Sequence, residues 1–335
     1  MSTIYLKKLM PKLIRVLFKL VLTLPLIFFL HSISAQTYPD RPLRLIVPFP
    51  PGGATDVVGR GLSAKLSLTW KHQLIVENKP GAGGNIGADL VAKSAPDGYT
   101  LLLSSPAEVA INPSLYSRMP YDASKDLIPV SKVASAPLVL VVNSDSPVKT
   151  VNELVQLIKS KKGGLNFASS GSGGPQHLAG ELFKSMANVF ITHIPYKGGA
   201  PAITDLLGGQ VDFFFAGIPP ALPHINSGRL RAVAVTTLKR SPLLPNVPTI
   251  SESGFPGFNI ENWQGIFVPA GTPNNIIQFL ATSIEKVSSD KNYYETLSSQ
   301  GAVPTPMPPK EFANFVQQEV QKYSKLVKES GAKAD

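Results

Sequence analysis

Residues 48–56 read Pro48-Phe-Pro-Pro-Gly-Gly-Ala-Thr-Asp56, between an expected strand and an expected helix. Gly52 and Gly53 let the backbone turn tightly and approach a ligand closely. The helix start presents N–H groups without intrahelical partners and the positive end of the helix dipole, which together attract anions. We expect Thr55 to cap this helix and Asp56 to lie in its first turn. The segment predicts an anion site built largely from backbone.

A second segment has the same order of strand, glycine loop and helix. It reads Phe167-Ala-Ser-Ser-Gly-Ser-Gly-Gly-Pro-Gln-His177. A Gly-Gly pair ahead of a helix is often a plain turn, and each loop alone is compatible with that interpretation. Two such loops facing one cleft would fit a carboxylate, and a diacid could be held at both ends. The pair of loops therefore favours a ligand site shared by two lobes.

The two loops contain no cationic side chain, since neither Pro48–Asp56 nor Ser169–Leu178 includes Lys or Arg. A helix end stabilises an anion by about 0.3–1 kcal/mol, or about 2 kcal/mol when it is partly buried. A micromolar ligand needs about 8 kcal/mol in total. Hydrogen bonds, apolar contacts such as Phe49 and the exclusion of water must therefore supply most of the binding free energy.

Short β-branched, apolar runs alternate with amphipathic stretches along the chain. The expected strands are Leu43–Pro48, Gln73–Glu77, Thr100–Ser104, Leu138–Asn143, Leu165–Ala168, Ile191–Pro195, Val211–Ala216, Leu230–Thr236 and Trp263–Val268. The expected helices are Asp56–Leu68, Ile86–Lys93, Val151–Ser160, His177–Met186, Ala200–Leu207, Asn274–Ser288 and Pro309–Ser330. This alternation predicts an α/β fold with parallel sheets.

No low-complexity linker separates the lobes, so the chain is expected to cross between them on ordered strands. We place the crossings near Leu138–Asn143 and Thr249–Val268. Lobe 1 would then be discontinuous, with residues 36–140 and 250–335, and lobe 2 would hold residues 141–249. The long C-terminal helices are expected to pack on lobe 1.

The first 35 residues read as an export signal. A basic stretch ends at Lys19, the apolar run Leu20–Leu30 follows, and small residues lead to Ala35. The apolar run is shorter than the roughly 20 residues that span a bilayer, so a cleaved signal is favoured over an uncleaved anchor. Met10 is an alternative start. The protein is therefore expected in the periplasm.

Charge and composition exclude several classes of function. The chain of 335 residues has a net charge of +10 and no cysteine. Disulfides, thiol nucleophiles and cysteine-ligated metals are therefore excluded. The first 35 residues are basic and hold no acid, so the remainder has a net charge of only about +5, which suits anionic ligands by long-range steering. The sequence has no basic cluster interleaved with aromatic residues, which is the pattern that would indicate nucleic-acid binding.

Catalytic and nucleotide-binding patterns are missing from the sequence. No serine stands in a G-x-S-x-G elbow, and no H-E-x-x-H motif occurs. The run Gly81-Ala-Gly-Gly-Asn-Ile-Gly87 resembles a dinucleotide fingerprint but has Ile86 where the third glycine belongs. The histidines lack metal-ligand spacing. His177, beside the second glycine loop, is the one histidine that we single out as a candidate ligand contact.

Nearly the whole chain after the signal resembles the substrate-binding proteins of tripartite tricarboxylate transporters, the Bug family. The matching stretches are Tyr38–Pro42, Pro51–Asp56, Val76–Gly84, Pro96–Thr100, Pro120–Asp122, Gly171–Gly174, His177–Glu181, Pro195–Gly199, Asp205–Asp212, Leu244–Thr249 and Pro269–Pro273. The resemblance implies a type II periplasmic binding protein, in which two α/β lobes with a ligand cleft between them close on the ligand. It also implies no cofactor, no metal and delivery to a membrane permease.

In that family the two glycine loops hold a ligand carboxylate, largely through backbone groups and water. By resemblance, the loops correspond here to Phe49–Asp56 and Ser170–His177. The predicted ligand-binding residues are Phe49, Gly52, Gly53, Ala54, Thr55, Asp56, Gly84, Ser104, Ser105, Ala107, Ser170, Gly171, Gly173, Gly174, Gln176, His177, Tyr196, Ala216 and Gly217.

The function expected from these observations is capture of a small carboxylate, which could be a diacid, a triacid, an aromatic acid or an acidic metabolite. The protein is expected to act as a monomer that passes its ligand to a tripartite tricarboxylate-type transporter, with no enzymatic activity. The alternative is a sensor component that presents the same kind of ligand to a signalling receptor. An enzyme remains the third class, and a catalytic pair in the cleft would favour it.

Overall fold

The computed structural model describes residues 38–334, and the chain from Arg41 onward forms one compact unit. The export signal expected in residues 1–35 lies outside the described residues. Within residues 38–334, none of the helices combines the length and the apolar composition that a bilayer crossing requires.

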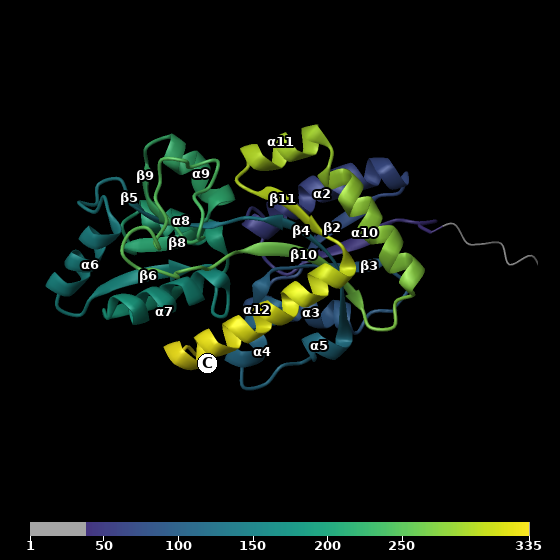
Figure 1. Cartoon of the computed structure of the whole chain (residues 1–335), viewed down its shortest axis with the longest axis horizontal. Coiled ribbons are helices and arrows are strands. Elements are labelled where there is room, and N and C mark those ends of the chain that lie inside the picture. The colour runs from purple at the N-terminus through teal and green to yellow at the C-terminus, as the bar shows by residue number, and fades with distance from the viewer. Residues whose placement is uncertain (1–37, 335) are drawn as a thin grey trace, which may run out of the picture. The chain divides into compact units, whose positions relative to one another are not determined.

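Two β-sheets organise this unit (Figure 1). The first sheet has the strand order β11-β4-β10-β3-β1-β2 and the second has the order β7-β6-β8-β5-β9. The strands of the first sheet are β1 Leu43–Val47, β2 Leu74–Asn78, β3 Thr100–Ser104, β4 Leu127–Ser135, β10 Trp263–Pro269 and β11 Val303–Met307. Those of the second are β5 Leu138–Asn143, β6 Leu165–Ser169, β7 Ile191–Pro195, β8 Phe213–Gly217 and β9 Leu230–Val235.

Helices connect most of these strands, as the alternation in the sequence predicts. The α-helices are α2 Ala54–Trp70, α3 Asn85–Ala92, α4 Asn112–Leu115, α5 Ala123–Asp126, α6 Val151–Ser160, α7 Pro175–Ala187, α8 Gly199–Leu207, α9 Ile218–Asn226, α10 Asn274–Ser288, α11 Lys291–Ser299 and α12 Pro309–Ser330. A 3-10 turn, η1 Ala82–Gly84, precedes α3, and a π-helical turn, η2 Ala107–Ile111, precedes α4. All nine expected strands and all seven expected helices are present, most with shifts of one or two residues at their ends.

The sheets are mixed, so the expectation of parallel sheets is wrong in part. Strand β1 pairs in parallel with β2 and β3, and β6 pairs in parallel with β7 and β8. In contrast, β10 is antiparallel to both β3 and β4, and β5 is antiparallel to both β8 and β9. The reason is that β5 and β10 are entered directly from the other sheet, without the helical crossover that a parallel neighbour requires.

Strands β4 and β11 and four helices were not predicted, and composition explains the omission of β11 and of the helices. Strand β11 contains Pro304 and Pro306 and lies at the edge of its sheet, where proline is tolerated. Helix α9 contains Pro219, Pro220 and Pro223. Helix α11 is largely polar, and α4 and α5 are single turns of four residues.

The segments that join the two sheets are hydrogen-bonded to one another. Ala136 follows β4, and its N–H donates to the Asn262 carbonyl at 2.8 Å. Thr236 follows β9, and its hydroxyl donates to the Ile260 carbonyl at 2.7 Å. The chain thus passes between the sheets on adjacent, ordered segments that meet directly before β10.

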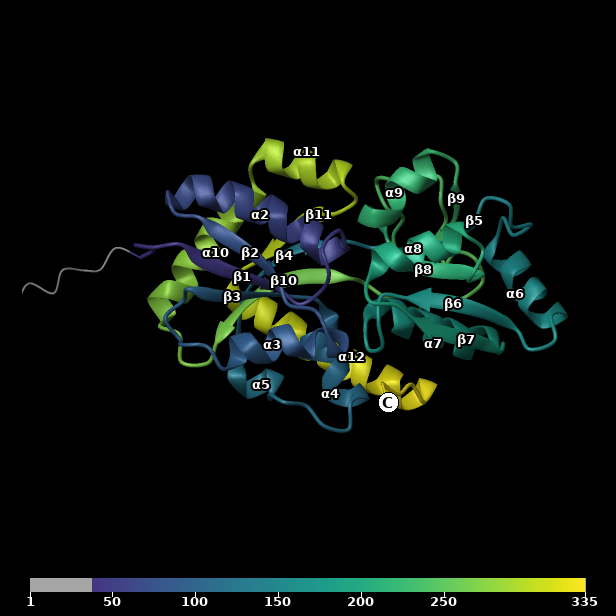
Figure 2. The same ribbon diagram turned by 180° about the vertical axis from the view of Figure 1, so that it is seen from behind.

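Helix α12 packs on β4 of the first sheet and also on α7 of the second (Figures 1 and 2). Phe312, near its start, is fully buried against Trp263 and Phe267, with ring centroids 5.6 and 5.3 Å away. Tyr323, further along, belongs to the core cluster of the second sheet. The C-terminal helix therefore contacts both halves of the unit, whereas the sequence led us to expect packing on lobe 1.

Candidate functional site

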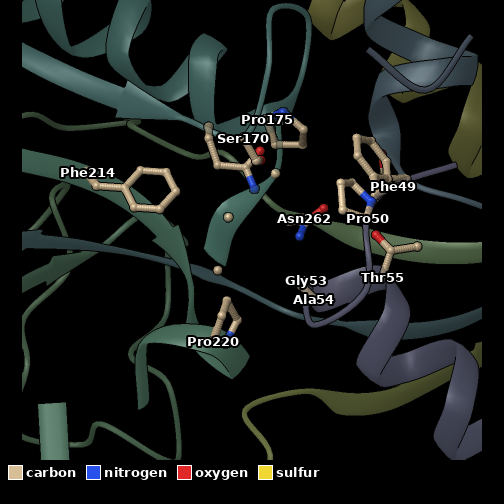
Figure 3. A pocket seen from close by; sticks show the side chains of 15 residues that line it. Phe49, Pro50, Gly53, Ala54, Thr55, Ser170, Pro175, Phe214, Pro220 and Asn262 are labelled. Atoms are coloured by element: carbon tan, nitrogen blue, oxygen red, sulfur yellow. The ribbon is translucent and has the colours of Figure 1, made fainter. Parts of the chain in front are cut away.

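A cavity lies where the loops after β1 and β6 approach each other (Figure 3). It encloses about 490 Å³ when open solvent is included. The 15 lining residues are Phe49, Pro50, Gly53, Ala54, Thr55, Ser105, Ser170, Pro175, Gln176, Gly198, Gly199, Phe214, Gly217, Pro220 and Asn262. None of these lining side chains is ionisable, so any charge bound here is met by neutral dipoles.

Three helices begin at the cavity and direct unpaired amides toward it. Helices α2, α7 and α8 have Gly53, Gly174 and Gly198 as their N-caps, and none of the three makes a side-chain capping bond. The lining residues Ala54, Thr55, Gln176 and Gly199 hold the first or second positions of these helices, so their backbone N–H groups have no acceptor within the helix. Free amides at helix starts are suited to an anion.

Thr55 does not cap α2, contrary to our expectation. The helix begins at Ala54, so Thr55 is already its second residue, and the N-cap position belongs to Gly53. Because a glycine N-cap has no side-chain oxygen, the first amides of the helix are left to a ligand. Asp56 does lie in the first turn, as predicted.

A fourth helix, α9, also begins at the cavity but contributes an apolar wall. The Ile218 N–H donates to the Pro137 carbonyl at 3.0 Å, and the next two residues, Pro219 and Pro220, have no N–H. Pro220 and Phe214 of β8 also line the cavity (Figure 3). The first three residues of α9 therefore add apolar surface and no unpaired amide.

The first glycine loop is held in place by Asp56 and Asn78. The Asp56 carboxylate accepts from the Gly52 N–H at 2.9 Å, from Arg60 at 2.9 Å and from the Asn78 amide at 2.9 Å. The same Asn78 amide donates to the Phe49 carbonyl at 2.9 Å. Burial alone would raise the pKa of Asp56, but the hydrogen bonds from Arg60, Gly52 and Asn78 lower it. Asp56 therefore positions the loop and does not line the cavity.

We expect Asp56→Ala to lower the free energy of unfolding by about 1–3 kcal/mol, because it leaves the Gly52 N–H and the Asn78 amide without an acceptor. Urea unfolding of the two proteins measures the loss. Since folding lowers the pKa of Asp56, its contribution is present above the unfolded pKa of about 3.9 and is lost as the pH falls through the folded pKa. The difference from wild type should shrink in acid. Asp145→Ala, at an exposed carboxylate, is the control, and an equal loss there would refute the role of Asp56.

The second glycine loop is supported by buried His177, which stacks on half-buried His193. The rings of His177 and His193 stack with centroids 4.0 Å apart and an interplanar angle of 11°. The Gly173 N–H donates to Nδ1 of His177 at 3.3 Å, and Nε2 of His193 lies 2.6 Å from the Ser169 hydroxyl. Burial lowers the pKa of His177 to about 4 and that of His193 to about 3. Both rings are therefore neutral near pH 7 and support the loop from behind.

The predicted ligand-binding residues are distributed over the cavity, a neighbouring hollow and the layer behind both. Those lining the cavity are Phe49, Gly53, Ala54, Thr55, Ser105, Ser170, Gln176 and Gly217. Gly84, Gly171 and Tyr196 line the neighbouring hollow, whose wall also includes Phe49 and Ser170. Gly52, Asp56, Ser104, Ala107, Gly173, Gly174, His177 and Ala216 line neither space. Contact of any of these residues with a ligand stays a prediction.

Sequence reasoning did not select seven lining residues, Pro50, Pro175, Gly198, Gly199, Phe214, Pro220 and Asn262. Gly198 and Gly199 belong to a third glycine turn ahead of a helix, which is the signal that we used for the other two loops. Asn262 directly precedes β10, at the second crossing between the sheets. Its burial, like that of Gln264 two residues further on, is seen only in the structure.

Glycine allows the two halves of the unit to touch across the cleft. A Cβ placed on Gly198 would lie 3.0 Å from Cγ of Pro50, and one on Gly217 would lie 3.3 Å from Cβ of Ala54. Contacts this close leave no room for a larger residue without movement of the facing loop.

The polar groups that line the cavity are suited to hydrogen bonding with a ligand. The cavity's polar side chains are hydroxyls and amides, and a nucleophile paired with a base is not among the 15 lining residues. Within residues 38–334, no group of three His, Asp or Glu side chains is placed to hold a metal ion. Free amides, hydroxyls and an apolar wall suit an anion with a hydrocarbon body.

Comparison with known proteins agrees with this architecture. A family model for the tripartite tricarboxylate transporter family receptor matches residues 57–332. BugT of Bordetella pertussis is 43% identical over 302 residues, covering 90% of this chain and 93% of BugT.

Solved structures show the same fold. The R. palustris protein Rpa4515, solved with adipate, is 36% identical with a TM-score of 0.85, over 88% of this chain and 98% of that chain. MatC from Rhodopseudomonas palustris, solved with bound malate, is 32% identical with a TM-score of 0.82, over 87% of this chain and 100% of MatC. The protein therefore belongs to the receptor family of tripartite tricarboxylate transporters and has the fold of its periplasmic binding proteins.

Proposed function

We propose that the protein is a periplasmic solute-binding protein that captures a small carboxylate in the cleft between two lobes and delivers it to the permease of a tripartite tricarboxylate transporter. The observation that carries the proposal is the set of three glycine-capped helix starts at a cavity without ionisable side chains. Relatives solved with adipate and with malate support the same class of ligand.

The proposal includes the remaining parts of this role. Residues 1–35 are removed on export, lobe 1 comprises residues 36–140 and 250–335, and lobe 2 comprises residues 141–249. The protein works as a monomer, is not an enzyme and binds no nucleic acid. A cavity lined by hydroxyls, amides and apolar groups, in a family of receptors, supports binding without turnover.

Isothermal titration of the mature protein against adipate, malate and an aromatic dicarboxylate tests the ligand class. Adipamide is the matched control because it keeps the length of adipate and removes both charges. We expect micromolar binding of at least one acid and none of the diamide. Silence toward all the acids, or equal binding of adipamide, would contradict the proposal.

We expect Gly53→Val to weaken adipate binding at least tenfold. Its free energy of unfolding should stay within about 0.5 kcal/mol of wild type. Gly53 has a φ of −80°, and a Cβ there would meet only the Pro50 carbonyl at 3.7 Å, so the backbone accepts a side chain. The added methyl groups would occupy the space beside the amides of α2. Titration and urea unfolding measure the two effects.

Gly61→Ala is the control for this variant, since Gly61 lies further along α2, outside the cavity lining, and a Cβ there would meet Leu297 and Tyr293 at 3.6 Å. It should bind adipate as wild type does. Unchanged affinity in the Gly53→Val variant would remove the first glycine loop from the site.

A further inference from the structure

A buried carboxyl group lies directly behind the cavity, where neither the sequence nor the proposed function assigns it a role. Glu108 is the second residue of the π-helical turn η2 and is fully buried. Its Oε2 atom lies 2.9 Å from the Ser104 hydroxyl, 3.1 Å from the Ser105 hydroxyl and 2.8 Å from the Ser105 N–H. Ser105 also lines the cavity, so this carboxyl is one hydroxyl away from the ligand space.

The hydrogen atoms in this cluster are too few for all its contacts when Glu108 is ionised. The Ser104 hydroxyl lies 2.8 Å from the Ser105 carbonyl as well as 2.9 Å from Oε2 of Glu108, yet it has one hydrogen to donate. An ionised carboxylate can only accept. A proton on Oε2 resolves the conflict, because Glu108 then donates to the Ser104 hydroxyl and Ser104 donates to the carbonyl.

The same count decides what Ser105 presents to the cavity. When Glu108 is ionised, the Ser105 hydroxyl donates its single hydrogen to Oε2 and has none for an anion. When Glu108 is protonated, that hydrogen is released and can turn toward a ligand. The Ala107 N–H already donates to this hydroxyl oxygen at 3.2 Å. The hydroxyl hydrogen is then the group that remains available for a ligand.

The second oxygen of Glu108 is enclosed without a hydrogen-bond partner in the described structure. It faces Gly84, which has a φ of +98° and where a Cβ would sit far inside contact distance of Oε1. Gly84 is therefore required both by its backbone angle and by the carboxyl packed on it. An ionised carboxylate with one unpaired buried oxygen is costly, which again favours the neutral acid.

We propose that Glu108 is a positioning residue that couples ligand capture to proton uptake: a carboxylate bound at Ser105 is accompanied by a proton on Glu108, which frees the Ser105 hydroxyl to donate to the ligand. The inference rests on the proposed function, because it takes the bound ligand to be an anion. It adds a titrating group to a site whose lining has none.

The surroundings of Glu108 supply no cation to hold it ionised. Burial raises the pKa of Glu108 to about 7, against the hydrogen bonds from its own N–H and from Ser105 and Ser104 that lower it. Packed elements β3, η1 and α4 carry no ionisable side chain. The Tyr121 hydroxyl donates to the Glu108 carbonyl at 2.8 Å, and that tyrosine stays neutral.

The other two packed elements, α5 and α12, carry their charged groups elsewhere. The ionisable residues of these helices are Lys125, Asp126, Lys310, Glu311, Glu319, Lys322, Tyr323, Lys325, Lys328 and Glu329. In the described structure none of them forms an ion pair or hydrogen bond with Glu108, and Glu319 pairs with Trp263 and Lys322. An anion entering at Ser105 is therefore the charge that acts on Glu108, and a like charge raises its pKa further.

The test is isothermal titration of adipate, with malate and an aromatic dicarboxylate as alternative probes, in buffers of different ionisation enthalpy. At pH 7.5 we expect wild type to take up roughly half a proton or more for each ligand bound. At pH 5.5 the uptake should vanish, because Glu108 is already protonated in the free protein. Affinity should fall by up to about tenfold for each pH unit above 8.

Glu108→Gln isolates the residue. The amide is uncharged at every pH and can donate to a serine hydroxyl as the protonated acid does. We expect this variant to bind without proton uptake, with an affinity that is independent of pH from 6 to 9. At pH 9 it should bind roughly 10- to 100-fold more tightly than wild type, which a merely structural role for Glu108 would not produce.

The possible outcomes separate this inference from the proposed function. Binding without proton uptake in wild type, or equal uptake in Glu108→Gln, overturns the coupling and leaves carboxylate capture intact. Failure of every acid to bind overturns both. If Glu108→Gln does not fold, the pH series in wild type decides alone, together with the appearance of a protonated carboxyl band in the infrared difference spectrum when adipate is added at pH 8.

Discussion

Asn262→Asp is expected to weaken adipate binding by about 100-fold at pH 8, which is the largest effect on affinity that we predict for a substitution in the cavity wall. The exchange replaces a neutral amide with an isosteric carboxylate in the wall of the cavity (Figure 3). Two unit charges about 4–6 Å apart at an effective dielectric constant near 20 repel by about 3–4 kcal/mol. No lining cation is available to offset this repulsion.

Wild type is itself the control for shape in this experiment, and Asn152→Asp is the control for net charge, because Asn152 is exposed on α6 and outside the cavity lining. Asn152→Asp should bind as wild type does. The affinity of Asn262→Asp should recover as the pH falls and the new carboxyl takes up a proton. A loss smaller than threefold at pH 8 would show that the bound group is not an anion near this wall.

Phe312→Ala is expected to lower the free energy of unfolding by about 3–5 kcal/mol. The ring is fully buried and packs edge-on against Trp263 and at an angle against Phe267. It also rests on the bare backbone of Gly265, where a Cβ would lie 2.2 Å from its Cζ. Removing the ring opens a cavity between α12 and the first sheet. Urea or thermal unfolding measures the loss.

Phe190→Ala is the matched control, since it deletes the same ring from a position that is 63% exposed. It should change the free energy of unfolding by about 0.5 kcal/mol or less. Similar losses in the two variants would mean that α12 is not held to the sheet by Phe312.

Sequence patterns predicted those helices and strands whose local secondary-structure preference agrees with their burial in the folded protein. Helices α6 and α12 have their expected bounds because their apolar periodicity matches the face that they bury, and β3 has its expected bounds because its apolar run is buried throughout. Helix α6 also has the reciprocal capping bonds of Thr150 and Glu153. Strand direction was predicted less well, because it depends on where the chain crosses between sheets, and periodicity carries no information about that.

The candidate site divides in the same way. Both glycine loops were identified because a strand, a glycine turn and a helix start can be read locally, and Ser105 and Gly217 were carried by the family resemblance. Glu108 was missed although it is the one acidic or basic residue between Thr100 and Ser117. A single charge in an apolar stretch signals a buried ionisable group, but its contact with two serines depends on the π-helical turn that bends it back.

The absence of charged side chains from the cavity lining also affects the protein when no ligand is bound. A buried lysine or arginine would have to be kept hydrated or paired whenever no ligand is present, and it would attract chloride and phosphate from the medium. Amides at helix starts can be solvated by water at little cost and attract small inorganic ions weakly. The ligand-free protein therefore holds no unpaired buried charge in this cavity, and inorganic anions compete only weakly with the ligand. It selects its ligand by the number and direction of hydrogen bonds that the ligand can accept.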